Sequence, residues 1–400
     1  MEVQFADRIN KVKKSFIREV LKVTQDSSYI SFAGGLPNPA SFPVQEISDA
    51  AVNVLKEDGA DALQYSTTEG YLPLRKAIAE RYGKRFGMKV GPENIVITNG
   101  SQQGLDLLGK LLLNAEDAVL FERPGYFGAI QALSFYEPDF CSVPLLEDGV
   151  DLEALESILK EKRPKLFYTV PNFQNPSGLT YSRENREKTA ALLKKYSTLL
   201  VEDDPYGELR FSGTEQPPIN SFMEGAGIML GSFSKIVSPA MRLGWICAAP
   251  EIIDRLVTTK QAADLHTNYF AQRVVQRYLA DNDLDEHIEK IKVMYSERCS
   301  CMAAMVQKYF PDGVHCTRPE GGMFMWVTLP DGLSSWDLLK LSTEEKVVFV
   351  PGSEFYVEDP DLRTFRINYT NSDADVIEAG ISRLGRSIRK LMHSTVNVVR

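Results

Sequence analysis

Short apolar runs alternate with amphipathic stretches between about residues 94 and 250. The runs are NIVIT, AVLFE, KLFYTV, TLLVED, GIMLGSFS and LGWICAA, and several are apolar at nearly every position, which is typical of strands buried on both faces. The stretches SQQGLDLLGKLLL, DLEALESILKEK and RENREKTAALLKKY repeat their apolar residues every three to four positions, as helices do. This alternation predicts an α/β fold, in which helices flank a mostly parallel central sheet.

The pattern changes near residue 284. One long charged helix, LDEHIEKIKVMYSERCSCMAAMVQKY, precedes the strand-like runs GMFMWVTL, KVVFV and TFRINYT and a closing helix after NSDAD. We therefore predict a large domain over residues 46–283 and a smaller α/β domain over 284–400. Residues 1–45 are expected to form an N-terminal arm with an amphipathic helix and to contribute to the small domain.

Composition excludes several classes of protein. The net charge of −9 argues against a nucleic-acid-binding surface, which is usually basic. No apolar run reaches the ~18 to 20 residues that span a bilayer, and the charged N-terminus lacks the apolar core of a signal peptide. We therefore expect a cytoplasmic protein without a membrane or nucleic-acid partner. The five cysteines follow neither a disulfide nor a zinc pattern, so we expect no metal site.

Polar and small residues follow the predicted strands, at the carboxyl ends where open α/β sheets bind ligands. NGSQQG follows NIVIT and begins a helix, whose backbone N–H groups and dipole suit a phosphate. Tyr126 follows AVLFE, Asn175 follows KLFYTV, and Asp203 and Tyr206 lie at the end of TLLVED and just beyond it. Each residue alone has an ordinary explanation in a core or a turn; their shared placement indicates one ligand site.

Lys235, in GSFSKIVSPAMRLGW, lies among serines and apolar residues shortly before Arg242. Lysines normally keep their ammonium groups in water. A desolvated lysine loses its proton more readily and becomes a nucleophile toward carbonyl groups. This lysine, a buried aspartate for a pyridinium nitrogen and a phosphate-binding helix start together fit pyridoxal phosphate.

The motifs resemble those of the fold-type I pyridoxal-phosphate-dependent aminotransferases of class I/II. Within that branch the chain is similar to the 2-aminoadipate/kynurenine aminotransferase group and to the catalytic domain of MocR-type regulators. The similar segments run from ISFAGGLPNPASFP through QYSTTEGYLPLR, PNFQNPSGLT, EDDPYGEL and EGGMFMWVTL to PGSEFY and FRINYT. Because the aminotransferase-like part of the chain begins almost at residue 15, which leaves no room before it for a winged-helix domain, we expect an enzyme and not a DNA-binding regulator.

The resemblance implies a role for each residue of the cofactor site. Lys235 would be the Schiff-base lysine and proton shuttle, and Asp203, in preference to Asp204, the pyridinium partner. Asn175 and Tyr206 would bind the phenolate oxygen. The other cofactor-binding residues would be Tyr126, stacked on the ring, and Ser101, Gln102, Ser232, Ser234 and Arg242 around the phosphate. Tyr65 would reach the phosphate of a partner subunit, which implies a homodimer with shared active sites.

The implied reaction moves an amino group between an L-amino acid and a 2-oxo acid. Arg366 resembles the arginine that binds the substrate α-carboxylate, and Gly35 would let the backbone approach the substrate closely. We expect glutamate and 2-oxoglutarate as one couple.

The other couple stays open at this stage. Arg18, if it faces the site, favours 2-aminoadipate or another dicarboxylic donor. A pocket formed by Phe173, Tyr65 and Tyr126 favours aromatic or aliphatic donors. His266 and Asn268 are further candidates for lining the partner's site. A lyase, a decarboxylase or a non-catalytic cofactor-binding sensor on the same fold remains an alternative, because these share the cofactor residues.

Overall fold

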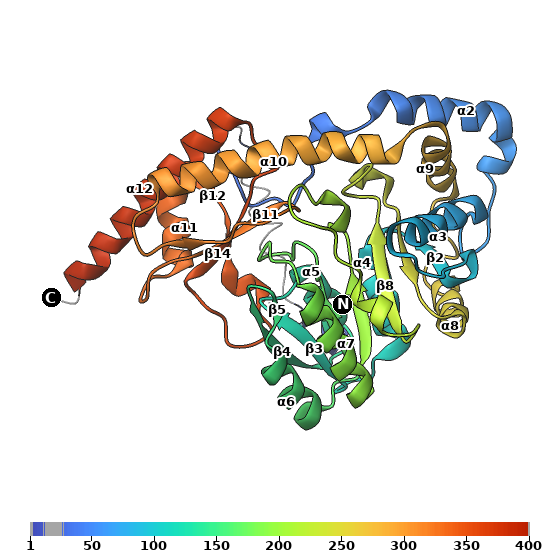
Figure 1. Ribbon diagram of the computed structural model, residues 1–400, viewed down its shortest axis with the longest axis horizontal. Helices are drawn as coiled ribbons and strands as arrows, with labels where there is room; N and C mark the ends of the chain where they lie inside the picture. Colours follow the sequence, from blue (N-terminus) through green and yellow to red (C-terminus); the bar gives the residue numbers. More distant parts are fainter. Residues whose placement is uncertain (1–2, 11, 13–25, 27, 399–400) are drawn as a thin grey trace.

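An eight-stranded mixed sheet forms the centre of the larger part of the molecule, in the order β2-β9-β8-β7-β6-β3-β4-β5 (Figure 1). The computed structural model describes residues 3–10, 12, 26 and 28–398. Strands β4, β3, β6, β7 and β8 run parallel, whereas β9 is antiparallel to β8 and β2, and β5 to β4. The strands are β2 (Ile95–Thr98), β3 (Ala118–Arg123), β4 (Asp139–Leu146), β5 (Gly149–Val150), β6 (Leu166–Thr169), β7 (Leu199–Asp203), β8 (Gly227–Ser232) and β9 (Gly244–Cys247).

All six strands predicted for this sheet are confirmed, and their fully apolar runs have a simple cause. In β3, Leu120 faces an apolar cluster with α6 and α7, and the next residue, Phe121, faces the cluster with α4. Phe167 and Tyr168 of β6 divide in the same way. Because both faces are covered by helices, each strand needs apolar residues at successive positions. The prediction missed β4, whose ends are partly exposed and whose sequence includes a proline.

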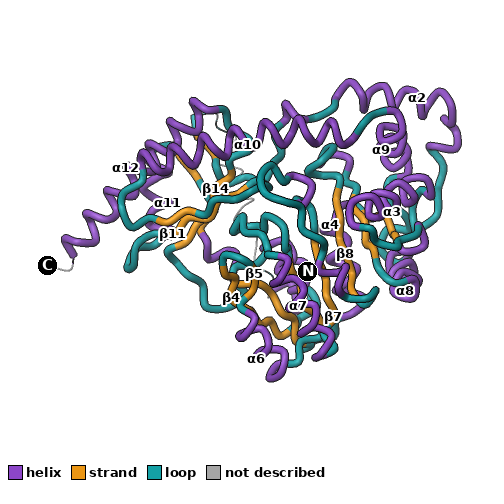
Figure 2. The backbone as a smooth tube through the Cα atoms, viewed as in Figure 1, coloured by secondary structure: helices purple, strands orange, loops and turns teal. Residues whose placement is uncertain are grey.

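Helices cover both faces of this sheet (Figure 2). The three predicted between residues 101 and 196 are confirmed, and the cap residues set where two of them begin: Asp151 accepts hydrogen bonds from the first backbone N–H groups of α6, and Ser182 from those of α7. The helices of this part are α2 (Val44–Ala62), α3 (Leu72–Phe86), α4 (Gly100–Leu112), α5 (Phe127–Ser134), α6 (Leu152–Lys162), α7 (Arg183–Tyr196), α8 (Pro250–Gln261) and α9 (Tyr269–Asp281).

A second sheet, of four strands in the order β10-β11-β14-β13, lies in the smaller part of the molecule. Its strands are β10 (His315–Cys316), β11 (Phe324–Thr328), β13 (Val350–Pro351) and β14 (Thr364–Asn368), and a further pair joins β1 (Ile30–Ser31) to β12 (Val347–Val348) in parallel. Helices α11 (Ser335–Glu344) and α12 (Ala374–Val398) pack beside them, and α10 (Leu284–Tyr309) runs from the large part to the small part (Figure 1).

Short 3-10 helices connect several of these elements. They are η1 (Asp7–Asn10), η2 (Pro39–Ser41), η3 (Pro92–Asn94), η4 (Gly207–Leu209), η5 (Ile219–Phe222), η6 (Pro239–Met241) and η7 (Gly352–Phe355). Among the described residues, no helix is both long and apolar enough to cross a membrane.

Helix α10 begins at Leu284, the residue at which the small domain is predicted to begin, and it runs from the large part to the small part (Figure 1). We propose that the domain boundary lies there. The pairing of β1 with β12 supports the proposal that part of the N-terminal arm belongs to the small domain. The boundary predicted after residue 45 falls inside the first turn of α2, which begins at Val44.

Candidate active site

A cavity of about 550 Å³ lies at the carboxyl ends of the parallel strands, between the two sheets. Tyr65 does not line it, but it brings together twelve of the predicted cofactor- and substrate-binding residues. These are Gly35, Ser101, Gln102, Tyr126, Asn175, Asp203, Tyr206, Ser232, Ser234, Lys235, Arg242 and Arg366. Their chain segments follow β2, β3, β6, β7 and β8, with one residue from β14 and one from the N-terminal arm.

Lys235 enters this cavity from the turn that follows β8. Phe233, Ile236 and Val237 are buried in the core, so the turn is anchored on both sides of the lysine. Its Nζ donates a hydrogen bond to the carbonyl oxygen of Gly35 at 2.9 Å. Burial, helped by the nearby guanidinium groups, lowers the pKa of Lys235 to about 8. About a tenth of its amine is therefore neutral, and nucleophilic, at pH 7, far more than for a lysine with the ordinary pKa of 10.5.

Asp203, the last residue of β7, is a buried carboxylate with one oxygen unsatisfied. Its Oδ2 accepts a hydrogen bond from the hydroxyl of Tyr168 at 2.8 Å, whereas Oδ1 has no partner. Burial raises the pKa of Asp203 to about 7. The adjacent Asp204 does not line this cavity; its Oδ1 accepts hydrogen bonds from Asn172 Nδ2 and the Gly207 N–H, both at 2.9 Å. Asp203, and not Asp204, is thus available to a protonated ring nitrogen.

Arg366 is a buried cation without an ion-paired carboxylate among the residues that the structure describes. Its Nη1 donates to Asn175 Oδ1 at 2.7 Å and its Nη2 to the Ala33 carbonyl at 2.6 Å, while Nε has no partner. The guanidinium lies over the ring of Phe324, 4.2 Å from its centroid. Burial lowers the pKa of Arg366 to about 10. A substrate carboxylate would supply the missing counter-charge.

The N-terminal turn of α4 and Arg242 together form a positively polarised wall of the cavity. Ser101 and Gln102 lie in that turn, where backbone N–H groups have no intrahelical acceptor. The Gln102 side chain itself donates to the Gly128 carbonyl at 2.8 Å. Gly100 has a φ of +72°, and a Cβ there would come within 2.5 Å of Arg242 Nη2. Glycine is needed both for the backbone conformation and for the close approach of the arginine.

These residues fit pyridoxal phosphate on three independent counts. The unpaired Asp203 Oδ1 suits a pyridinium N–H, the α4 terminus with Arg242 suits a phosphate, and Lys235 has a low-pKa amine in the same cavity. Asn175 Nδ2 and the Tyr206 hydroxyl lie 3.4 Å apart and face the cavity together, as a pair of donors to one ligand oxygen would.

Comparison with known proteins agrees with this geometry. The family model described as "Aminotransferase class I and II" matches residues 33–384. The chain belongs to this family. It is 41% identical to the aromatic-amino-acid aminotransferase 1 of Thermococcus litoralis, over 98% of this chain and 95% of the relative.

Two solved structures are also similar over nearly the whole chain. One is the α-aminoadipate aminotransferase of Thermus thermophilus in complex with N-(5′-phosphopyridoxyl)-L-leucine; it is 41% identical with a TM-score of 0.91, over 97% of this chain and 98% of that one. The other is the kynurenine aminotransferase of Pyrococcus horikoshii, 43% identical with a TM-score of 0.93, over 96% and 97%. The protein is thus a fold-type I aminotransferase whose cofactor is pyridoxal phosphate. The relatives at about 41% identity are aminotransferases, which supports transamination over the lyase and sensor alternatives.

One predicted pocket residue is wrong. Phe173 is fully buried beneath Arg210, whose guanidinium lies 4.8 Å from the ring centroid, and it does not line the cavity. An aromatic residue beside a polar turn gives no indication of which way its ring points. The cavity is instead lined by residues that the sequence did not single out: Phe127, Gly128, Gln131, Val170, Pro205, Pro239 and Phe324.

Tyr65, His266 and Asn268 do not line the cavity. Tyr65 is 80% exposed, and its ring lies 5.8 Å from that of His266. Asn268 caps α9 by accepting a hydrogen bond from the Ala271 N–H at 2.8 Å, so it has a structural role. Arg18 lies outside the described residues.

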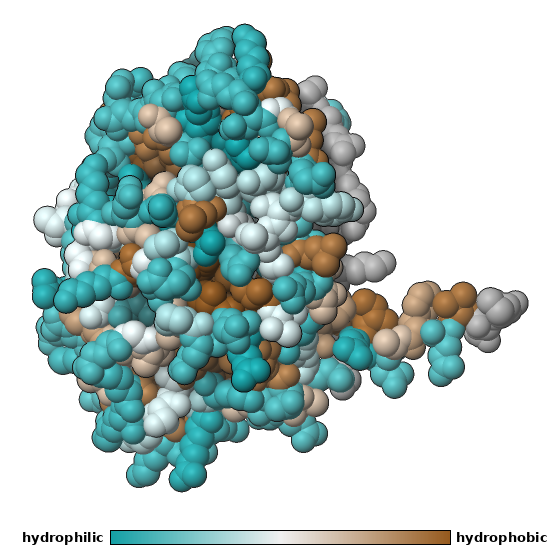
Figure 3. Space-filling model, turned by 90° about the vertical axis from the view of Figure 1, so that its right-hand side faces the viewer, coloured by the Kyte–Doolittle hydropathy of each residue, from teal (hydrophilic) through white to brown (hydrophobic). Residues whose placement is uncertain are grey.

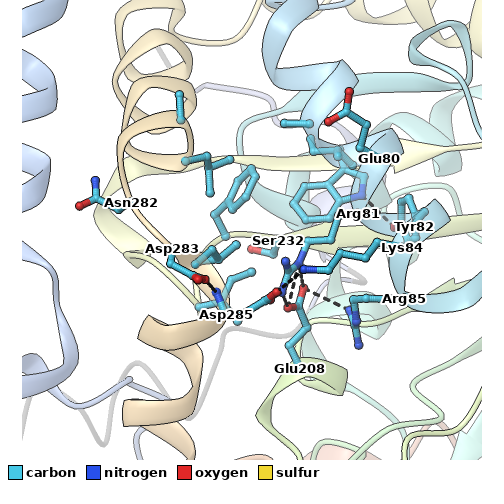
Figure 4. Close-up of a pocket in the computed structure, with 18 of the residues that line it drawn as sticks. Glu80, Arg81, Tyr82, Lys84, Arg85, Glu208, Ser232, Asn282, Asp283 and Asp285 are labelled. Carbon is cyan, nitrogen blue, oxygen red and sulfur yellow. Dashed lines mark hydrogen bonds and ion pairs between the residues drawn. The ribbon is translucent and has the colours of Figure 1, made fainter.

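A second cavity, of about 630 Å³, is lined by Ser232, Phe233 and Ile236, which are close to Lys235 in the sequence, and by residues of α3 (Figure 4). Its floor includes Phe233 and Trp245. Each cation on its rim is already paired: Arg81 with Glu208 and Asp285, Lys84 with Asp285, and Arg85 with Glu208 and Glu215. No unsatisfied buried side-chain atom among the described residues belongs to its lining. The cations of its described lining are therefore paired without a ligand.

Proposed function

We propose that this protein transfers the amino group of an aromatic or other large apolar L-amino acid to 2-oxoglutarate. The observation that carries the proposal is Arg366, a buried guanidinium that lacks a counter-charge and lies over Phe324. Such a group binds an α-carboxylate in a bidentate manner. The nearby aromatic residues Tyr126 and Phe127 suit an apolar side chain on the same substrate.

Each residue in this proposal has one task. Bound pyridoxal phosphate supplies the electron sink that makes the substrate α-proton acidic. Lys235 would hold the cofactor through Nζ and, when the substrate has released it, take the proton from the α-carbon as a neutral amine. Asp203 would keep the ring nitrogen protonated. Arg366 would orient the α-carboxylate, and its bond to Asn175 fixes the guanidinium plane.

A dicarboxylic donor is the second candidate, because one of the similar structures is an α-aminoadipate aminotransferase. The cations in the described lining are Lys235, Arg242 and Arg366, and all three are assigned to the cofactor or the α-carboxylate. The distal carboxylate of such a donor, like that of 2-oxoglutarate, would therefore need a further cation, for which Arg18 is our proposal. Arg18→Gln should then slow 2-aminoadipate and glutamate selectively and leave phenylalanine unaffected.

We propose a homodimer with shared active sites. Helix α2 and the loop after it expose the apolar residues Val52, Leu55 and Leu63 together with Tyr65. In Figure 3, apolar side chains interrupt the polar surface on the side where α2 and α3 lie. A second copy that covers this face would bring its Tyr65 to the phosphate site. Light scattering at micromolar concentration tests the dimer.

We further propose a cytoplasmic location.

The test of the function uses single amino donors without an oxo acid. Purified protein loaded with cofactor is mixed with each donor, and the visible band of the lysine-bound cofactor and the 2-oxo acid product are both measured. Fast loss of the band with phenylalanine or tyrosine, and formation of the matching 2-oxo acid, supports the proposal. Faster reaction with 2-aminoadipate than with any aromatic donor would favour the second candidate. A band that changes without any oxo acid would contradict transamination.

A further inference from the structure

Glu122, next to the last residue of β3, is a buried carboxylate that the catalytic roles above do not use. It is 2% exposed and forms no ion pair within the described part of the chain. Oε1 accepts hydrogen bonds from Thr169 Oγ1 at 2.6 Å, Tyr181 Oη at 2.7 Å and the Val170 N–H at 3.2 Å. Its Oε2 accepts one from Gln174 Nε2 at 2.9 Å. Four donors converge on a carboxylate that lacks a cation.

Gln174 connects Glu122 to the two segments that follow strands β3 and β6. Its Nε2 also donates to the Pro124 carbonyl at 2.7 Å, and its Oε1 accepts from the Ser177 N–H at 2.8 Å. Pro124 lies two residues before Tyr126, and Gln174 immediately precedes Asn175. One side chain therefore joins the segment that carries the stacking tyrosine to the turn that carries the asparagine bonded to Arg366.

We infer that Glu122 is a positioning residue for transamination, which through Gln174 holds Tyr126 and Asn175 in place against the cofactor and Arg366. The inference rests on the proposed roles of Tyr126 and Asn175. Burying a carboxylate is unfavourable unless hydrogen bonds compensate it, and burial raises the pKa of Glu122. A glutamine would retain one acceptor but place a second amide donor against Gln174 Nε2. Glutamate is needed at this position because only a carboxylate accepts hydrogen bonds at both of its oxygens.

A purely structural role is the competing explanation, and the chain offers a matched control. Glu202, on β7, is also fully buried, and burial raises its pKa too. It accepts hydrogen bonds from the Ile219 N–H at 3.0 Å, the Asn220 N–H at 2.9 Å and Asn220 Nδ2 at 3.0 Å, and so holds η5. Neither Ile219 nor Asn220 lines the catalytic cavity. Glu202 precedes Asp203 on β7, but its hydrogen bonds go to η5, so Glu202→Gln removes comparable hydrogen bonding from partners that do not line the cavity.

The first experiment measures amide hydrogen exchange on the cofactor-free forms of Glu122→Gln, Glu202→Gln and the wild-type protein. We expect faster exchange over residues 123–127 and 170–179 in Glu122→Gln, and over 218–223 in Glu202→Gln. This readout does not depend on catalysis, so it can fail or succeed independently of the proposed function. Unchanged exchange at 123–127 and 170–179 in Glu122→Gln would overturn the inference.

The second experiment compares the loaded enzymes. Glu122→Gln should weaken cofactor affinity and lower kcat by about 10- to 100-fold, the equivalent of one lost hydrogen bond to a charged group. It should also shift the pH at which the visible band titrates. Glu202→Gln should leave both unchanged even where its thermal stability falls equally. Equal losses in the two variants would overturn the positioning role.

The double variant Glu122→Gln, Gln174→Glu exchanges the two side chains, so that an amide donor at position 122 again faces a carboxylate acceptor at position 174. The Pro124 carbonyl loses its donor in this variant. We expect partial recovery of cofactor affinity relative to Glu122→Gln alone. A double variant no better than Glu122→Gln would contradict the proposed pairing through Gln174.

Discussion

Replacing Asp203 by asparagine should stabilise the cofactor-free protein while it weakens cofactor binding. In the unfolded chain this carboxyl ionises near 3.8, whereas burial raises its pKa to about 7 in the folded protein. The folded state therefore binds more protons between these values, and stability falls as pH rises through this range. The difference corresponds to about 4 kcal/mol at pH 8, at about 1.4 kcal/mol for each pKa unit.

Asp203→Asn removes that cost, because the amide has no charge to desolvate and its oxygen still accepts from Tyr168. The free energy of unfolding should rise by up to about 4 kcal/mol at pH 8 and by less than about 2 kcal/mol at pH 5. The same change would remove the charge that we propose keeps the ring nitrogen protonated. Losing this charge-assisted bond should cost about 1.5–3 kcal/mol of cofactor affinity and slow the half-reaction.

Urea unfolding of cofactor-free wild-type protein and Asp203→Asn at pH 5 and pH 8 measures the stability change. Asp204→Asn is the control, since Asp204 already accepts two hydrogen bonds from Asn172 and Gly207. The control should be destabilised at both pH values. If Asp203→Asn gave no gain at pH 8, or an equal gain at pH 5, the reasoning about the unpaired oxygen would be refuted.

Four further outcomes follow from the site and the residues that support it. Burial lowers the pKa of Lys235 to about 8. The rate at which cofactor attaches to the cofactor-free protein should therefore rise with pH and reach half its maximum near pH 8. A stopped-flow rate profile that is flat from pH 6 to 10 would contradict this prediction. Lys235→Ala should nearly abolish turnover in a coupled assay, and Lys235→Arg should not restore it. Arg366→Lys should raise KM for the donor by about 10- to 100-fold through loss of the bidentate contact, and equal KM values would exclude that contact. Asp264 accepts hydrogen bonds from buried Lys260 and from Asn99 and Gln103 at the start of α4. Asp264→Asn should therefore destabilise the protein by about 3–5 kcal/mol and weaken phosphate binding, as measured by urea unfolding and by titration with inorganic phosphate.

Local patterns were sufficient to predict much of the fold. Strands covered on both faces have uninterrupted apolar runs, and α10 begins and ends at the residues that its periodicity predicts. The cavity was also largely predictable, because parallel strands place their carboxyl ends at one edge of the sheet. Lys235, Asp203 and Asn175 therefore meet although they are distant in sequence.

The orientation of single side chains was not predictable. Phe173 and Phe324 are both aromatic residues near glycines, yet the first turns under Arg210 and the second lies against Arg366 in the cavity. Which of them faces the site depends on the packing of the two sheets against each other. Glu122 was missed for a similar reason. Within AVLFER it has the pattern of an ordinary charged residue at the end of a strand. Its four hydrogen-bond donors lie far away in the sequence, on Thr169 of β6, Val170, Gln174 and Tyr181.

The positions of two tryptophans give the protein internal fluorescent reporters. Trp245 packs against Phe233, and their ring centroids are 4.9 Å apart. Phe233 in turn lies two residues before Lys235 in the sequence. Trp326 on β11 pairs in register with Arg366 on β14. Quenching at Trp245 would report loading of the lysine, and a change at Trp326 would report occupation of the carboxylate site. In a Trp336→Phe background, replacing either of these indoles by phenylalanine would leave a single reporter, so that cofactor and substrate binding could be timed separately in unlabelled protein.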